Sequence, residues 1–427
     1  MMSHNPRRVL VACPDARPPA YEAVIGLANA GLLDRFQTAF YHGGDGPWLS
    51  LGSRLSPART ARLRRVLGRR HHPEIPRANV RADWSYDLAL QVEGRLPARH
   101  RRARNLLARW RARSFDRRLA RALLRHQPAT ALIFSDVGSE FSLPACRKYG
   151  IATVLSMVHG DVREESEILD REAATAPDFF PIYLGDGAFD RGELAWLHAR
   201  RLRDLELADL ILVPSDHIAE SLVRHGTPRG KVRVIPYAAD LDRFRPDPSK
   251  RHDAACTFLF AGGITQRKGI KYLLEAWRQV RRPGWRLQLL GPLPRDLGPL
   301  GPYLDEVEPL GRVGHAEMPA RMAAADVFVF PSLFEGSAVV TYEALACGLP
   351  CVVTPNAGSV VRDGIEGRLV PAGDVQRLAE AMEQLGADPE LRARTSARAR
   401  ARAETFGWPR YHAAVVAAAR EARPSWS

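Results

Sequence analysis

Short apolar segments alternate with longer amphipathic stretches along most of the chain. Aliphatic and β-branched residues dominate each short segment, and helical periodicity returns between the segments. This alternation is typical of parallel strands that are joined by crossover helices. The pattern therefore predicts an α/β protein. Strands are expected over residues 8–13, 37–42, 131–135, 153–158, 210–214 and 232–236, and again over 257–261, 286–290, 307–310, 327–331, 350–354 and 368–370.

The predicted strands form two sets, separated by a segment without periodicity. Residues 237–253 contain prolines and charged residues, which is typical of an interdomain linker. We expect one domain over residues 1–245 and a second over residues 250–405. A last amphipathic helix over residues 409–422 could pack on either domain, so residues 406–427 could pack back on the first. A chain of 427 residues usually divides in this way.

The composition is that of a globular protein without export signals. Hydrophobic residues make up 45% of the chain, enough to build buried cores. No apolar run approaches the roughly 18 residues of a membrane-spanning helix, and the run after Arg8 stops at Cys13, too early for a signal peptide. We expect a cytoplasmic protein. The five cysteines are scattered and fit no common zinc spacing, so we interpret them as buried reduced thiols.

Positive charge is concentrated in one segment. Residues 51–130 contain 21 arginines, no lysine and five acidic residues, a net charge of +16 against +14 for the whole chain. The segment fits an ordinary domain helix with a solvated face or a contact with an anionic membrane surface. Nucleic acid is a less favoured partner because no nucleic-acid-binding motif accompanies the charge. Within residues 95–125 the apolar residues at nearly helical spacing are Leu106, Leu107, Trp110, Phe115, Leu119 and Leu123.

Two common nucleotide-binding motifs are absent. Residues 14–19 follow the first predicted strand without a glycine, so the GxGxxG fingerprint of dinucleotide-binding domains is missing there. The GxxxxGK[ST] motif of P-loop proteins does not occur either. The sequence therefore disfavours nicotinamide dehydrogenases, P-loop kinases and P-loop ATPases.

The turn after residues 257–261 suits a phosphate ligand. Gly262 and Gly263 let the backbone approach a ligand closely, and Arg267 and Lys268 lie at the predicted start of the next helix. Two glycines and two cations at a helix start would fit a diphosphate. A glycine turn with ordinary surface cations explains this segment equally well.

A later strand-to-helix turn carries two glutamates at different depths. Glu335 lies in the turn, and a helix that begins near residue 338 carries Glu343 about a turn and a half further on. Glu343 could accept hydrogen bonds from a vicinal diol such as ribose. Glu335 would face a ligand group at the N-terminal end of the helix. Taken singly, each glutamate also fits a solvated or capping residue. The backbone amides that would meet phosphate are those of Ser337, Ala338 and Val339.

These segments together resemble the donor domain of family-4 retaining glycosyltransferases of the GT-B fold. The resemblance covers roughly residues 205–408 and includes residues 262–277, the spacing from Glu335 to Glu343, and residues 348–350 and 364–371. It implies two Rossmann-like domains with a cleft between them and a C-terminal helix that crosses back to the first domain. The roles that it implies are diphosphate binding by Lys268, ribose binding by Glu343 and contact with the transferred sugar by Glu335.

The chain departs from this family at three places. Where the family has a glycine before the linker aspartate, this chain has Ala238 and Ala239. The family usually has an arginine where this chain has Gly263, so we assign the second phosphate contact to Arg267. The paired glycines that usually follow the first strand are missing on the acceptor side.

His159 follows a predicted buried strand where related enzymes place a histidine against the donor sugar, which makes it a candidate catalytic residue together with Glu335. Without the resemblance, a lone histidine more often has a structural role.

No metal or other cofactor is expected. Asp240 and Asp242 have the Asp-x-Asp spacing that single-domain sugar transferases use for a divalent metal, but their position in the linker favours a turn or a cap. Basic side chains and helix dipoles can stabilise a departing diphosphate instead.

The resemblance thus implies a retaining hexosyltransferase that takes its sugar from a UDP- or GDP-sugar donor. The acceptor would be a lipid-linked glycan, a polysaccharide or another cell-envelope glycoconjugate, and the protein would be cytoplasmic or peripheral on the inner face of the membrane. Two alternatives stay open. One is a nucleotide-sugar epimerase or a phosphorylase on the same fold, and the other is a non-catalytic protein that binds lipid or nucleic acid.

Overall fold

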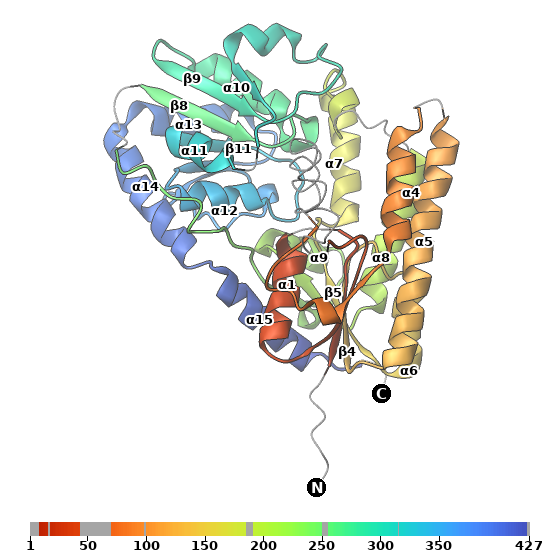
Figure 1. Ribbon diagram of the computed structural model, residues 1–427. Coiled ribbons are helices and arrows are strands. Elements are labelled where there is room, and N and C mark those ends of the chain that lie inside the picture. The colour runs from red at the N-terminus through yellow and green to blue at the C-terminus, as the bar shows by residue number, and fades with distance from the viewer. Residues whose placement is uncertain are drawn as a thin grey trace, which may run out of the picture.

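Two parallel sheets organise the protein (Figure 1). The computed structural model describes residues 8–15, 18–42, 70–97, 100–184, 191–249, 255–314 and 316–424. The strand order is β3-β2-β1-β4-β5-β6-β7 in the first sheet and β10-β9-β8-β11-β12-β13 in the second. In both sheets the chain starts at a central strand, winds to one edge and then crosses over to the other. This is the doubly wound Rossmann-like arrangement, and it confirms the predicted fold class.

The first sheet is built from the N-terminal half of the chain. Its strands are β1 (Val9–Ala12), β2 (Leu33–Thr38), β3 (Val80–Ala82), β4 (Thr130–Phe134), β5 (Ala152–Ser156), β6 (Leu210–Val213) and β7 (Val232–Val234). The α-helices of this half are α1 (Pro18–Asn29), α4 (Trp84–Arg95), α5 (Arg101–His126), α6 (Ser142–Tyr149), α7 (Val162–Thr175), α8 (Arg191–Leu207) and α9 (Asp216–Arg224).

The second sheet follows residue 255. Its strands are β8 (Cys256–Ala261), β9 (Trp285–Leu290), β10 (Glu308–Gly311), β11 (Val327–Phe330), β12 (Cys351–Val353) and β13 (Gly367–Leu369). Its α-helices are α10 (Ile270–Val280), α11 (Met318–Ala324), α12 (Val339–Ala346), α13 (Val375–Ala387) and α14 (Pro389–Glu404), and the last helix of the chain is α15 (Trp408–Glu421).

Central strands are buried on both faces, which explains their continuous apolar sequence. Every residue of β4, β5 and β6 is buried. In the second sheet the Phe260 and Phe330 rings stack with their centroids 5.6 Å apart. Helices cover both faces of such a sheet, so no strand face needs polar residues.

The prediction of a strand over residues 37–42 is wrong by about four residues, because β2 begins at Leu33. Its early residues are polar and are satisfied by side chains of neighbouring elements: Asp34 pairs with Arg8, and Arg35 contacts His126. The edge strand β3 was not predicted, since its three half-buried or exposed residues form no apolar run.

The last helix crosses back to the first half of the chain, as the resemblance implies. In Figure 1 the blue segment runs from α14 beside the second sheet to α15 beside α1. The Tyr411 hydroxyl donates to the carbonyl of Pro19 at 2.9 Å, and His412 Nε2 lies 2.6 Å from a carboxylate oxygen of Glu22. A Cβ atom on Gly26 would lie 2.8 Å from the Cβ of His412, so the two helices meet where α1 has no side chain.

The segment between the two sheets is irregular but packed. Residues 237–249 form neither helix nor strand beyond a short turn, yet Tyr237 and Phe244 are buried in the core that the two halves share. Asp240 Oδ1 accepts hydrogen bonds from the amides of Asp242 and Arg243, so it stabilises a turn. Residues 250–253 of the predicted linker lie outside the described residues.

The arginine-rich segment forms a hairpin of α4 and α5 at one edge of the molecule (Figure 1). Its predicted apolar stripe divides in two: Phe115, Leu119 and Leu123 are buried, whereas Leu106 and Trp110 are exposed. The difference arises because the later turns of α5 pack on the sheet and on α6. Residues 51–69 and 98–99 of the segment lie outside the described residues.

In the parts of the chain that are described, we find no helix with both the length and the apolar character to cross a membrane.

All five cysteines lie in the described part of the chain. Each is buried, and none is in a disulfide. Burial raises the pKa of the Cys146 thiol to about 12, which keeps this thiol protonated and unreactive. The cysteines therefore belong to the cores, as predicted.

Candidate functional site

The turns that follow the strands of the two sheets meet at the boundary between the halves. A Cβ atom on Gly336, in the turn after β11, would lie 2.3 Å from the carbonyl oxygen of Val158, which follows β5. The Ser215 hydroxyl, after β6, donates to the carbonyl of Gly336 at 3.1 Å. The carboxyl edge of a doubly wound sheet is where ligands bind, so this junction is the candidate site.

Lys268 and Glu335, two of the predicted site residues, form an ion pair there. Lys268 Nζ also lies 5.1 Å from the centre of the Phe330 ring, and the Ser332 hydroxyl donates to Glu335 Oε1 at 3.3 Å. Burial lowers the pKa of Lys268, and the Glu335 carboxylate opposes this shift. The pair therefore places a cation and an acceptor of hydrogen bonds side by side in a largely buried position.

Arg267 lies beside this pair and reaches toward the other half. Its Nε donates to the Phe334 carbonyl at 3.0 Å, and its backbone amide donates to the carbonyl of Tyr183 at 3.2 Å. Arg267 and Lys268 were expected at the start of a helix. They belong instead to a 3-10 turn (Gln266–Lys268), because Gly269 with a φ of 75° interrupts the chain before α10 begins.

Several backbone amides near this pair have no acceptor among the described residues. They include the amides of Gly263, Ser337 and Val339. The amides of two other predicted residues are already used: Gly262 donates to the Leu290 carbonyl at 2.9 Å, and Ala338 donates to the Ala357 carbonyl at 3.0 Å. The Ser337 hydroxyl donates to the carbonyl of Gly358 at 2.6 Å, which fixes the turn before α12.

Glu343 occupies the fifth position of α12 and is half-buried. Burial raises the pKa of its carboxyl group to about 7, and Arg243 only partly opposes this shift. Among the described residues, none forms a hydrogen bond or an ion pair with this carboxylate. A half-buried carboxyl group with unfilled acceptor positions is the kind of group that a ligand hydroxyl can satisfy.

His159 enters the junction from the first half and is buried. Its Nδ1 donates to the Gly160 carbonyl at 2.8 Å, because a carbonyl oxygen can only accept. Its Nε2 makes no hydrogen bond within the described chain and lies 3.6 Å from Asp136 Oδ1. Gly160 packs against Phe334 and the Glu335 carbonyl, so the His159 turn meets the turn that carries Glu335.

The sequence reading missed Asp136, which follows β4. Asp136 has a φ of 74°, a left-handed conformation that non-glycine residues rarely adopt. Arg201 holds its carboxylate with contacts of 2.7 and 3.0 Å, and Asp204 accepts a hydrogen bond from its amide at 3.1 Å. Burial tends to raise the pKa of Asp136, but Arg201 and His159 lower it well below its usual range. No pattern in the sequence signals this conformation.

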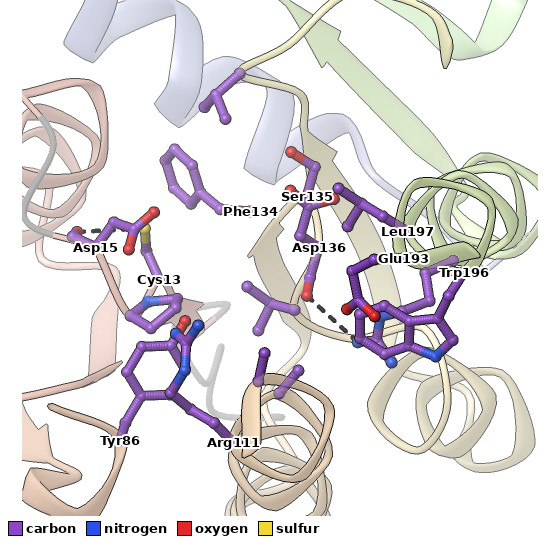
Figure 2. A pocket seen from close by; sticks show the side chains of 16 residues that line it. Cys13, Asp15, Tyr86, Arg111, Phe134, Ser135, Asp136, Glu193, Trp196 and Leu197 are labelled. Carbon is purple, nitrogen blue, oxygen red and sulfur yellow. Dashed lines mark hydrogen bonds between the residues drawn. The ribbon is translucent and has the colours of Figure 1, made fainter. Parts of the chain in front are cut away.

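A cavity of about 250 Å³ opens beside Asp136 in the first half (Figure 2). Its walls come from the residues after β1, β4 and β5 and from α4, α5 and α8. Figure 2 shows Tyr86 and Arg111 on one side and Glu193, Trp196 and Leu197 on the other. The lining residues are Cys13, Pro14, Asp15, Tyr86, Ala108, Arg111, Ala112, Phe134, Ser135, Asp136, Val137, Val158, Glu193, Trp196, Leu197 and Arg200.

Three buried donors in this wall lack a hydrogen-bond partner within the described chain. They are the Ser135 hydroxyl and the Nε atoms of Arg111 and Arg200. The rest of each guanidinium group is engaged: Arg111 pairs with Glu93 at 3.2 Å and lies over the Tyr86 ring, and Arg200 lies 4.9 Å from the centre of the Trp196 ring. The cavity wall thus combines aromatic rings with polar and charged side chains, which suits a ligand that carries hydroxyl groups.

Three hydrogen bonds outside this cavity also join the two halves. Glu172 of α7 is fully buried and accepts hydrogen bonds from Gln266 Nε2 at 2.6 Å and from the Tyr272 hydroxyl at 2.8 Å. Lys271 Nζ donates to the Thr175 carbonyl at 3.0 Å. These contacts join α7 to the segment that carries Arg267 and Lys268. No group of three metal-ligating side chains occurs within the described chain.

Comparisons with known proteins agree with this architecture. The family model "Glycosyltransferase Family 4" matches residues 83–243, and the model "Glycosyl transferases group 1" matches residues 255–388. A protein of Escherichia coli K12 that is named for colanic acid biosynthesis, the glycosyltransferase WcaL, is 35% identical over 198 residues, which cover 42% of this chain and 49% of that protein. A D-inositol 3-phosphate glycosyltransferase of Saccharomonospora viridis is 34% identical over 241 residues, covering 50% of this chain and 56% of that protein. The chain thus spans about half the length of the curated relatives it matches.

The fold extends over the whole chain. A sucrose-phosphate synthase of Thermosynechococcus elongatus superposes with a TM-score of 0.63 at 18% identity and covers 97% of this chain and 99% of its own. The Anabaena protein HepE, solved in complex with UDP and glucose, superposes with a TM-score of 0.57 at 16% identity and covers 96% and 99%. These likenesses show the two-domain GT-B fold. Since the two family models match its two halves in turn, this chain belongs to the family-4 glycosyltransferases, the glycosyl transferases of group 1.

Proposed function

We propose that this protein transfers a hexose from a nucleoside-diphosphate sugar to a hydroxyl group of a glycan acceptor, with retention of the anomeric configuration. The observation that carries the proposal is the meeting of Lys268, Glu335 and His159 at the junction of the two halves. The turn that carries His159 packs against the turn that carries Glu335, and Glu335 pairs with Lys268. Such an arrangement fits a substrate held between the domains.

The donor diphosphate would replace Glu335 as the partner of Lys268. A phosphate offers the ammonium group a stronger anionic partner than one carboxylate, and the unpartnered amides of Gly263, Ser337 and Val339 add donors nearby. Glu335, once released, would accept hydrogen bonds from the hydroxyls of the transferred sugar. The Glu343 carboxyl group would accept hydrogen bonds from the ribose. HepE was solved with UDP-glucose, which supports a uridine diphosphate donor over a guanosine one.

The reaction would break the bond between the anomeric carbon and the phosphate oxygen, and form a bond from that carbon to the acceptor oxygen on the same face. The acceptor proton would pass to the departing phosphate oxygen. A covalent alternative needs a carboxylate on the opposite face of the sugar. The carboxylate on the side of the first half is Asp136, and both its oxygens are held by Arg201. His159 lies beside it, where Nε2 could accept or donate a hydrogen bond at the sugar. Lys268, Arg267 and the amides would stabilise the growing charge on the diphosphate, so we expect no need for a metal.

The acceptor would occupy the cavity beside Asp136. That cavity is lined by the rings of Tyr86 and Trp196 and by polar side chains, and Asp136 joins it to His159. A volume of about 250 Å³ lies below the usual range of whole-ligand pockets, so it would hold one sugar unit of a longer acceptor.

Thermal shift measurements with UDP, GDP, ADP and their sugars test the donor assignment, because a ligand that binds only the folded state raises its melting temperature. We expect UDP and a UDP-sugar to stabilise the wild-type protein. Lys268→Ala should abolish this shift and lower turnover by about 100-fold or more, since it removes a charge contact that strengthens in the transition state. Lys148→Ala, which removes an exposed lysine of α6, is the matched control and should behave as the wild type.

Product stereochemistry tests the mechanism. With an α-linked donor, NMR of the product should show an α linkage. A β-linked product would contradict retention, and a glycosyl adduct trapped on a carboxylate would contradict only the absence of an intermediate. Unchanged turnover in EDTA is expected, while loss of turnover that Mg²⁺ or Mn²⁺ restores would show that a metal takes part.

A further inference from the structure

The helices α4 and α5 expose a group of large apolar side chains on their outer faces. Trp84, Leu88 and Val92 recur every four residues along α4 and are 67%, 55% and 45% exposed. Leu106 and Trp110 have the same spacing on α5 and are 68% and 50% exposed. Residues four positions apart lie on one face of a helix, so each helix presents an apolar stripe to the outside. We call these five residues the apolar surface.

Packing among the described residues does not explain the apolar surface. The inner faces of the same helices are used: Tyr86 packs edge-to-face on Phe115 at 5.6 Å, and Phe115, Leu119 and Leu123 belong to a buried core cluster. Soluble proteins rarely keep two tryptophans and three aliphatic side chains exposed on adjoining helices unless something binds there.

Positive charge surrounds the apolar surface. Helix α5 alone contains ten arginines and a single acidic residue, Asp116, which is buried and bonded to the amides of residues 140–142. Some of these arginines are neutralised, as in the pairs of Arg109 with Glu193 and Arg118 with Asp83. Others, including Arg102, Arg121 and Arg125, are exposed and have no ion pair among the described residues. The outer faces of α4 and α5 therefore combine exposed apolar side chains with an excess of positive charge.

We propose that the α4–α5 hairpin docks on an anionic lipid bilayer, with the apolar surface inserted at the level of the headgroups. Tryptophan is suited to this depth because its ring is apolar and its N–H is polar. Leucine and valine gain free energy in hydrocarbon, whereas a polynucleotide would leave Leu88, Val92 and Leu106 in water. If a second copy of the chain bound to this surface, two arginine-rich helices would come together, and the repulsion between their like charges would oppose binding.

The hairpin also forms one wall of the cavity, through Tyr86 on α4 and through Ala108, Arg111 and Ala112 on α5. Docking through the outer faces would therefore hold the cavity within a helix diameter of the lipid headgroups, about 10 Å. If the cavity binds the acceptor, as proposed above, the acceptor would be a glycan attached to a lipid. This last step rests on the proposed function, and the docking itself does not.

Vesicle flotation tests the docking. The wild-type protein should float with vesicles of phosphatidylcholine and phosphatidylglycerol, bind pure phosphatidylcholine at least tenfold less, and lose binding as salt screens the charges. The variant Trp84→Ser/Leu88→Ser/Trp110→Ser should bind anionic vesicles about tenfold or more weakly, because three inserting side chains are lost. Arg102→Glu/Arg121→Glu should show a similar loss.

Two control variants carry equivalent changes elsewhere. Val223→Ser/Leu297→Ser removes exposed apolar residues, and Arg394→Glu/Arg398→Glu reverses two exposed arginines of α14. Both should float as the wild type does. Circular dichroism melting of every variant checks the fold, and UDP-induced thermal shifts should be the same in all of them, which separates this proposal from the proposed function.

The depth of insertion can be measured separately. The chain has eight tryptophans, and lipids brominated near the headgroup should quench part of their fluorescence. Trp84→Phe/Trp110→Phe should remove most of this quenching. Three results would overturn the proposal: absence of wild-type binding to anionic vesicles, equal binding by the triple serine variant, or an unchanged quenching in the double phenylalanine variant. Displacement from vesicles by duplex DNA at equal charge concentration would identify a nucleic acid site instead.

Discussion

Glu343 illustrates how a binding residue can reduce the stability of the protein that carries it. Its carboxyl group has a pKa of about 7 against 4.5 for an ordinary glutamate, chiefly because burial disfavours the charged form. Between these two pH values the folded protein binds more protons than the unfolded chain, so its free energy of unfolding falls as the pH rises. The group is destabilising above pH 7 when no ligand is bound.

Glu343→Gln should therefore stabilise the ligand-free protein at pH 8, by on the order of 1 to 3 kcal/mol, and have little effect below pH 4.5. The same substitution should weaken binding of UDP, because an amide accepts the ribose hydroxyls less well than a carboxylate. Urea unfolding at several pH values measures the first effect, and titration calorimetry measures the second. A stability difference that does not change with pH would show that the Glu343 carboxyl group is not perturbed.

A substitution of Asp136 tests the side of the junction that the first half of the chain forms. Asp136→Asn keeps a residue that tolerates the left-handed conformation but removes the charge that Arg201 and His159 face. Turnover should fall about 10- to 100-fold through misplacement of His159, while the dissociation constant of UDP stays within about twofold. Comparison of kcat with donor affinity separates positioning from donor binding. A parallel loss of UDP affinity would place Asp136 in the donor site.

The residues that could be found from the sequence are those in short motifs with regular spacing. Lys268 and Glu335 lie in the segments that follow β8 and β11, and parallel strands of one sheet end at one edge, so their meeting could be anticipated. The ion pair between them could not, because it depends on the turn that Gly269 makes. Asp136 carries no motif, and its importance comes from contacts with residues more than 60 positions later.

At the scale of elements, strands buried on both faces were the easiest to locate. β2 was misplaced because its polar start is satisfied by side chains of other elements, and β3 is too short to form an apolar run. The two faces of α5 could not be told apart from spacing alone, since both contain leucine and an aromatic residue. Only the packing partner decides which face is buried.

The crossing of α15 over α1 gives a prediction at this scale. Gly26→Ala places a Cβ atom 2.8 Å from the His412 Cβ and 2.9 Å from its Cα, so the helices must separate. Such overpacking should destabilise the protein by about 1 to 3 kcal/mol. Gly94→Ala in α4 is the control, because its Cβ would meet nothing within 4 Å. A helical glycine replaced by alanine without a clash should instead stabilise by about 0.5 to 1 kcal/mol. Equal effects of the two variants in thermal unfolding would contradict the close packing.

At the scale of the molecule, the contact between Gly336 and Val158 holds the two halves close together. Gly336→Ala would place a Cβ atom 2.3 Å from the Val158 carbonyl oxygen, and neither backbone can easily move within its own half. We expect the halves to open, so that small-angle X-ray scattering shows a larger radius of gyration and turnover falls about 100-fold. UDP affinity should be kept, since the proposed donor contacts of Lys268 and Glu343 belong to one half.

Gly301→Ala, where a Cβ atom would meet nothing within 4 Å, is the matched control and should leave scattering and turnover unchanged. An unaltered radius of gyration together with normal turnover in Gly336→Ala would show that this contact does not control the approach of the halves.

The contacts of Glu172 with Gln266 and Tyr272 could not have been anticipated from the sequence either, because they join residues about 100 positions apart without any motif.

The position of α15 also matters while the protein is being made. The first sheet is complete once β7 has left the ribosome, but the helix that covers α1 is synthesised only after the entire second half. At about 5 to 20 residues per second this delay lasts on the order of ten to forty seconds. Through that interval α1 lacks its partner, and the apolar residues that will pack on α15 are exposed to other nascent chains and to chaperones. Rare codons or pauses in the second half would lengthen this exposure, so the yield of folded protein should depend on translation speed far downstream of the domain at risk.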